Sequence, residues 1–141
     1  MSTTEQNREI VRRIQEAYDS GNLDALDALV ASDIKSADEL PGGPGGLAGA
    51  KGAHQMVLSW FPDYKVEIDE ILAEGDRAIA RFTVSGTHKG EMMGVPPTGK
   101  HYSVPGFSEY RIENGKAVEH WGLHDNYGVM VQLGLIPAPG A

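Results

Sequence analysis

The chain has 141 residues, of which 20 are acidic and 12 basic, and its formal charge at pH 7 is −8. No segment concentrates lysine and arginine, so we expect neither nucleic acid nor a membrane surface as a partner. Cysteine is absent, which excludes disulfides, thiolate metal sites and a cysteine nucleophile. The polar N-terminus and the lack of a long apolar run predict a cytoplasmic protein, with one domain over residues 1–141.

Helical signals dominate the first third of the chain. Thr3 and Gln6 have the spacing of a capping box, and apolar residues then recur at helical intervals from Ile10 to Tyr18. Asn22 is expected to cap a second helix that carries the apolar residues from Leu23 to Val30. These signals predict two consecutive helices separated by a glycine.

The next segment is less regular. Residues 32–40 are ambiguous and would allow a short strand, whereas the composition of residues 41–46 predicts a loop, which we expect to form a mobile rim. A third helix is expected to place Ala53, Met56, Val57, Trp60 and Phe61 on one side and to end at the following proline.

From Tyr64 onward the apolar residues alternate with a period of two, which is typical of strands. The dipeptide Asn114-Gly115 suits a type I′ hairpin turn between two long strands. The expected elements are a strand that alternates at Tyr64, Val66 and Ile68, a turn at 74–76 and a strand through residues 79–84. Strands from about His101 to Ile112 and from Lys116 to His124 follow, and then a short helix over 126–133 ended by Gly134.

Helices followed by a run of antiparallel strands indicate the α+β class. A long antiparallel sheet that curls around three helices would enclose a conical cavity. We therefore expect a central pocket between the sheet and the helices.

The chain resembles the SnoaL-like polyketide cyclases of the nuclear transport factor 2-like superfamily. The residues that carry this resemblance are Gly86–Glu91, Gly94–Lys100, the Tyr110–Trp121 hairpin, Asp125 and Gln132–Gly134. The resemblance implies the cone-shaped fold, a homodimer, and an aspartate acid/base that the motif places at Asp125. It also implies relatives that include ketosteroid isomerases and epoxide hydrolases. The family often has a histidine where this chain reads Asp33-Ile34-Lys35-Ser36-Ala37, which is a departure.

Asp125 has two interpretations. In a regular strand, Ala117, Glu119, Trp121 and Leu123 would share one face with Asp125, and three of these neighbours are apolar, so this face is expected to lie against the helices. A carboxylate at the mouth of an apolar cavity would have a raised pKa and serve as an acid/base. Alternatively, Asp125 caps the helix that begins at Asn126.

His120 and His124 are separated by about 13 Å on a regular strand, so they cannot share a metal ion there. A regular strand also turns both away from Trp121 and Asp125, and we expect them to be partly exposed or at a subunit interface. A bulge near Gly122 would reverse His124, which makes His124 the second catalytic candidate.

Several aromatic residues and one histidine are candidates for contacts with a flat hydrophobic substrate. The alternative is ordinary core packing for the aromatic residues and an exposed position near a loop for the histidine. They are Tyr18, Trp60, Phe61, His88, Tyr102 and Trp121. The remaining histidines, His54 and His101, are expected near loops at the surface.

Glu119 and Arg81 on neighbouring strands are expected to form a structural ion pair, or else part of a water-activating set like that of the epoxide hydrolases. No metal, flavin or nicotinamide signature is present in the sequence, so we expect no cofactor. The resemblance favours acid/base, aldol-type chemistry on a hydrophobic polyketide-like ester. The alternatives are a non-catalytic protein that binds a small apolar molecule, and another reaction of the superfamily, such as isomerisation or epoxide hydrolysis.

Overall fold

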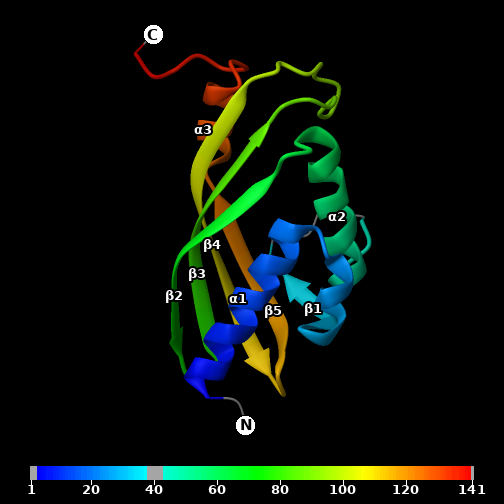
Figure 1. Cartoon of the computed structure of the whole chain (residues 1–141), viewed down its shortest axis with the longest axis vertical. Helices are drawn as coiled ribbons and strands as arrows, with labels where there is room; N and C mark the ends of the chain where they lie inside the picture. Colours follow the sequence, from blue (N-terminus) through cyan, green and yellow to red (C-terminus); the bar gives the residue numbers. More distant parts are fainter. Residues whose placement is uncertain (1–2, 38–42, 141) are drawn as a thin grey trace.

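The computed structural model describes residues 3–37 and 43–140. The elements of this part of the chain, in order, are α1 (Thr4–Ser20), the 3-10 helix η1 (Leu23–Ala28), β1 (Val30–Ser36), α2 (Gly46–Trp60), β2 (Lys65–Glu74), β3 (Arg77–Thr87), β4 (His101–Glu113), β5 (Lys116–His124) and α3 (Asn126–Gln132). The α+β class is confirmed, and Figure 1 shows a long curved sheet with α1 and α2 on the same side of it.

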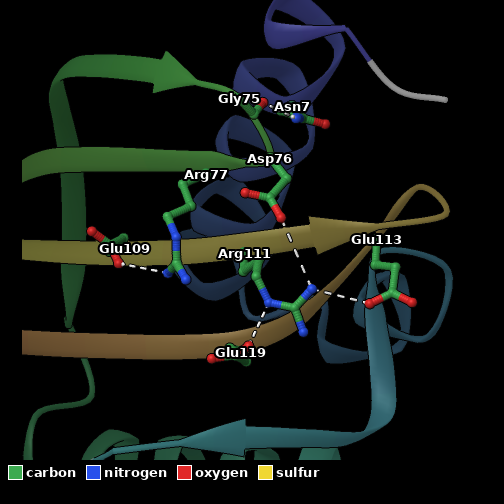
Figure 2. Close-up of polar contacts among 8 residues, drawn as sticks. All are labelled: Asn7, Gly75, Asp76, Arg77, Glu109, Arg111, Glu113 and Glu119. Atoms are coloured by element: carbon green, nitrogen blue, oxygen red, sulfur yellow. Dashed lines mark hydrogen bonds and ion pairs between the residues drawn. The ribbon is translucent and has the colours of Figure 1, made fainter.

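The first helix begins and ends as the sequence predicts. The Thr3 side chain accepts a hydrogen bond from the Gln6 backbone, the Gln6 side chain accepts one from the Thr3 backbone, and Gly21 ends the helix with φ 76°. A left-handed residue at this position costs glycine little because it has no Cβ. The side chain of buried Asn7 then ties α1 to the β2–β3 turn by donating to the carbonyl of Gly75 (3.2 Å; Figure 2).

The prediction of a second helix that extends to Val30 is wrong. Residues Leu23–Ala28 form a 3-10 helix, and the Asn22 side chain makes no capping hydrogen bond. Val30 is instead the first residue of β1, where it is buried and lies opposite Ala117 of β5. The ambiguous segment 32–40 therefore contains the second half of a strand.

The sheet has the order β1-β5-β4-β3-β2. The pairs β2–β3, β3–β4 and β4–β5 are antiparallel as predicted, but β1 pairs with β5 in the parallel sense. The tight turn between β4 and β5 has positive φ at both Asn114 (51°) and Gly115 (78°), as a type I′ turn requires. The expectation of an entirely antiparallel sheet is therefore wrong only at its β1 edge.

The core lies between the concave face of the sheet and the helices. Helix α1 packs against β2 and β3, α2 packs against β1, and α3 packs against β4. Val11 and Ile14 of α1, Ala80 of β3 and Leu133 after α3 are all at most 1% exposed. In the described segments, no helix combines the length and the apolar character that a membrane-spanning helix needs.

The loop predicted at residues 41–46 lies partly outside the described residues. Gly43 and Pro44 are described, and α2 begins at Gly46 with φ 70°. A Cβ on Gly46 would lie 2.4 Å from the Ser32 carbonyl oxygen. Glycine therefore allows α2 to begin directly against β1.

Candidate functional site

A cavity of ≈ 630 Å³ lies between α1, α2 and the inner face of the sheet. Its walls combine apolar side chains with a few polar groups, as ligand sites commonly do. The residues most relevant to its chemistry are Gln15, Tyr18, His54, Tyr64, Ser108, Tyr110, His120, Gly122 and His124. The expectation of a pocket between sheet and helices is therefore met.

The orientation of β5 differs from the prediction because the strand contains a bulge. Ala117 lies opposite Ile112, whereas Glu119 lies opposite Arg111, so Val118 is an extra residue without a partner. An extra residue exchanges the two faces of the strand beyond it. The bulge near Gly122 considered from the sequence lies instead four residues earlier.

This bulge turns His120 and Gly122 toward the cavity. His120 lies opposite Tyr110, and Gly122 lies opposite Ser108; Tyr110 and Ser108 are both buried. Residues that are directly opposite in a sheet share a face. The prediction that Glu119 and Trp121 lie on the helix-covered face is therefore wrong, and so is the prediction that His120 and His124 face away from it. Leu123 follows the alternation of the outer face but still lines the cavity.

The His120 ring is held in place from three sides. Its Nε2 lies 3.2 Å from the Ser108 hydroxyl oxygen, and the ring stacks on Tyr110 with centroids 4.6 Å apart and an interplanar angle of 26°. Gly122 leaves the space that the ring occupies, because a Cβ there would lie 2.8 Å from His120 Cε1. The side-chain amide of Gln15 donates to the Tyr110 hydroxyl (3.3 Å), which connects this cluster to α1.

Asp125 is the N-cap of α3. Its carboxylate accepts a hydrogen bond from the backbone N–H of Gly128 at 2.8 Å, and its side chain is exposed. Its neighbours His124 and Asn126 both line the cavity, whereas Asp125 is not among the lining residues. Of the two interpretations of Asp125, the geometry therefore agrees with the helix cap.

The α2 wall of the cavity contributes a buried histidine. His54 is 7% exposed and lies between two tyrosine rings, with centroid distances of 4.9 Å to Tyr18 and 5.3 Å to Tyr64. Burial lowers the pKa of His54 and raises the pKa of Tyr64 to about 12. The expectation that His54 lies at the surface near a loop is wrong, because it is on the buried side of a helix.

Four of the proposed substrate-contacting residues lie away from this cavity. Phe61 packs edge-on against Tyr102 (4.8 Å), near His88 (5.8 Å) and Trp60 (6.4 Å), and none of the four lines the cavity. His88 is fully buried rather than exposed, and its Nδ1 accepts a hydrogen bond from the Thr98 backbone N–H. Of the proposed substrate-binding residues, only Tyr18 lies in the cavity wall.

Trp121 lies on the outer face of the sheet. It is 38% exposed and lies beneath the guanidinium of Arg77 at 5.1 Å. Glu119 is also on this face and pairs with Arg111, which reaches Glu113 as well (Figure 2). The predicted Glu119–Arg81 pair is therefore wrong.

Arg81 instead lies 4.0 Å from Asp69 and 3.7 Å from Glu70. Its partners are thus carboxylates of the adjacent strand β2, at the edge of the sheet. A set that joins Glu119 to Arg81 therefore does not form, and Glu119 instead shares Arg111 with Asp76 and Glu113.

The curved sheet, the helices and the enclosed cavity define a protein of the nuclear transport factor 2-like class. The model of the SnoaL-like polyketide cyclase family matches residues 8–133, and the chain belongs to this family. It is an enzyme of the SnoaL-like cyclase type.

Individual relatives agree with this assignment. Aklanonic acid methyl ester cyclase DnrD of Streptomyces peucetius is 27% identical over 129 residues, which cover 89% of each chain. The structure of IdmH from Streptomyces antibioticus is similar with a TM-score of 0.81 and 34% identity, over 92% of this chain and 99% of that one. TsrD from Streptomyces laurentii gives a TM-score of 0.86 at 27% identity, over 96% of this chain and 100% of that one.

Proposed function

We propose that the protein catalyses an intramolecular aldol-type ring closure of a hydrophobic polyketide-like ester, with His120 and Ser108 as the proton-transfer pair. The observation that carries this proposal is the pair itself, whose Nε2 and Oγ atoms lie 3.2 Å apart on the wall of the cavity. The name of the relative from Streptomyces peucetius, an aklanonic acid methyl ester cyclase, supports the ester as the substrate class.

The size and walls of the cavity suit such a substrate. Small-molecule sites usually enclose about 300–1,000 Å³, and this cavity has ≈ 630 Å³. Phe82, Val57 and Val66 contribute apolar surface to its lining. Apolar walls fold a flexible chain into a compact shape and keep water away from the enolate that forms.

The reaction consists of proton transfers around one new carbon–carbon bond. The Ser108 hydroxyl oxygen takes a proton from a carbon between two carbonyl groups while its own proton passes to His120 Nε2, leaving an enolate and an imidazolium. The enolate carbon attacks a second carbonyl of the same molecule, which closes the ring and produces an alkoxide. The proton then returns from His120 through Ser108 to the alkoxide, so that substrate and product are isomers.

An imidazole suits this task better than an ordinary carboxylate. Unperturbed histidine titrates at about 6.5 and unperturbed aspartate at about 3.9, so histidine is the stronger base near neutral pH. A well-placed general acid/base contributes roughly 10²–10⁴-fold to a rate. Stacking on Tyr110 and the space at Gly122 hold the ring in the orientation that the transfer needs.

Asp125 and His124 remain the alternative acid/base groups, and variants distinguish the candidates. Purified protein is incubated with aklanonic acid methyl ester, and ring closure is followed by chromatography with absorbance detection. His120→Gln is expected to reduce kcat by roughly 10²–10⁴-fold, whereas Asp125→Asn keeps the capping acceptor and most of the activity. If Asp125→Asn loses activity while His120→Gln keeps it, the base is Asp125. If the wild-type protein binds the ester without converting it, the proposed reaction is wrong.

We further propose that two copies pair through the outer face of the sheet. One row of paired residues crosses four strands of this face, namely Leu72, Ile79, Glu109 and Trp121. Leu72, at one end of the row, is 59% exposed. Exposed apolar side chains that line up across a sheet are typical of an interaction surface. The family resemblance also favours a homodimer.

A further inference from the structure

His54 is a buried polar residue of the cavity wall that the proposed reaction does not use. It is 7% exposed and lies between the rings of Tyr18 and Tyr64. Its Nε2 is buried and has no hydrogen-bond partner among the described residues. Buried polar atoms are nearly always paired in folded proteins, so an unpaired one on a residue of a cavity wall is a candidate partner for a bound ligand.

The hydrogen bonds of the ring determine which nitrogen carries the proton. The His54 ring forms a hydrogen bond with the backbone of Tyr18, and this bond raises the pKa of the ring. A backbone group that favours the protonated ring must accept a hydrogen bond from it, so the partner is the Tyr18 carbonyl oxygen. Tyr18 lies in the last turn of α1 (Thr4–Ser20), where carbonyl groups have no partner within the helix. Because Nε2 is unpaired, Nδ1 is the donor. In the neutral ring Nε2 then has a free lone pair.

Several observations support a neutral His54. Burial lowers its pKa, and the effect of the Tyr18 carbonyl is the smaller of the two. The neighbouring phenol of Tyr64 keeps its proton, because burial raises its pKa to about 12. No ion pair with His54 is present among the described residues. His54 is thus a hydrogen-bond acceptor rather than a positive charge.

The second buried histidine with an unpaired Nε2, His88, provides an internal comparison. Its Nδ1 accepts a hydrogen bond from the Thr98 backbone N–H at 3.2 Å, so its neutral ring carries the proton on Nε2. His88 therefore presents a donor, and it does not line the cavity. Within residues 3–37 and 43–140, His54 is the one histidine that combines an unpaired acceptor with a place in the cavity wall.

We propose that His54 Nε2 accepts a hydrogen bond from a phenolic or enolic hydroxyl of the substrate, so that the cavity selects hydroxylated aromatic ligands. This inference rests on the proposed function for the identity of the site. It adds the substrate class, an aromatic polyketide with a free hydroxyl group on the ring that faces α2. In this assignment His54 is a positioning and specificity residue and takes no part in the proton transfer at His120.

Ligand binding tests the assignment without the natural substrate. The probes are 2-naphthol, which has a hydroxyl donor, and 2-methoxynaphthalene, which has the same rings without one. Their dissociation constants are measured by calorimetry for the wild-type protein, His54→Asn and His54→Gln. The asparagine amide can still donate to the Tyr18 carbonyl from the Nδ1 position, whereas the glutamine amide oxygen reaches the Nε2 position as an acceptor.

The wild-type protein is expected to bind 2-naphthol about tenfold more tightly than 2-methoxynaphthalene, which corresponds to one well-made hydrogen bond. His54→Asn should abolish this preference, and His54→Gln should restore part of it. Nitrogen NMR of the wild-type protein should show Nδ1 protonated and Nε2 unprotonated, with only Nε2 responding strongly to 2-naphthol. This NMR experiment decides the question if either variant fails to fold.

An equal preference in the wild-type protein and His54→Asn would overturn the inference. Protonation of Nε2 in the free protein, or no binding of either probe, would overturn it as well. His120→Gln separates this test from the proposed function. If His120→Gln still converts the ester and also binds 2-naphthol more tightly than 2-methoxynaphthalene, the catalytic proposal fails while the role of His54 stands.

Discussion

The substitution Gly122→Ala tests the catalytic proposal through the position of a single ring. A Cβ at residue 122 would lie 2.8 Å from Cε1 and 3.0 Å from Nε2 of His120. Carbon atoms in contact prefer a separation of about 3.5–4.0 Å, so the ring must move by roughly 0.7–1.2 Å. The hydrogen bond between Nε2 and the Ser108 hydroxyl is already 3.2 Å long, and a shift of this size breaks it.

The expected effects on stability nearly cancel. The lost hydrogen bond costs about 1 kcal/mol, whereas replacing a strand glycine by alanine recovers roughly 0.5–1 kcal/mol. The φ of Gly122 lies outside the left-handed region, so alanine adds no backbone strain. Urea unfolding should therefore show a free energy within about 1 kcal/mol of the wild-type value.

The effect on activity should be much larger. A displacement of about 1 Å in a catalytic group can reduce a rate by about 10²-fold, and we expect this loss in kcat for the ester. The double variant Gly122→Ala/His120→Gln should be no less active than His120→Gln alone, because both changes act through the same ring. A full additional loss in the double variant, or a wild-type kcat in Gly122→Ala, would refute the reasoning.

Three further predictions follow from the same geometry. Asp125→Ala removes the acceptor for the Gly128 N–H and should lower the free energy of unfolding in urea by about 1 kcal/mol; an unchanged value would contradict the capping role. Leu72→Glu places a charge on the exposed outer face and should convert the proposed dimer to a monomer in light scattering, whereas an unaffected dimer would mean that another face pairs. Burial lowers the pKa of His54 in the folded protein. Below about pH 6.5 the unfolded chain therefore binds a proton at His54 that the folded protein does not bind, and the free energy of unfolding falls as the pH decreases. His54→Asn lacks this contribution, so the difference in unfolding free energy between the wild-type protein and this variant should narrow between about pH 7.5 and about pH 5.5; a constant difference would show that His54 titrates equally in both states.

Local rules explain the parts of the fold that the sequence predicts well. The capping box at Thr3, the glycine that ends α1 and the Asn114-Gly115 turn each depend on a few adjacent residues. The bounds of β5, Lys116–His124, agree with the predicted strand. These features need no knowledge of distant partners, because backbone sterics and short-range hydrogen bonds determine them.

The features that the sequence does not predict depend on contacts between distant segments. The parallel pairing of β1 with β5 brings together segments separated by more than 80 residues in the chain, and no local pattern signals it. Similarly, α2 turns His54 inward because the Tyr18 carbonyl and two tyrosine rings receive it. A histidine among small apolar residues has no signature of its own, so its burial depends on partners in α1 and before β2.

The bulge at Val118 has the greatest consequence for function. In a regular strand, Glu119 and Trp121 would face the helices, and the cavity wall would present a carboxylate and an indole. With one extra residue, the same strand presents His120, Gly122 and His124 to the cavity. The small residues Ser108 and Gly122, opposite each other, then leave room for an imidazole ring beside a hydroxyl group.

The two faces of β5 consequently have separate roles. The outer face presents Trp121 and the ion pairs of Arg77 and Arg111, which are suited to an interface. The inner face presents an imidazole that a stacked ring and a hydroxyl group hold in one orientation. Since a shift of one residue in the pairing of β4 and β5 would exchange these faces, the bulge must be retained for His120 to reach the substrate. The chemistry proposed for this enzyme therefore depends on the register of one hairpin as much as on the identity of its residues.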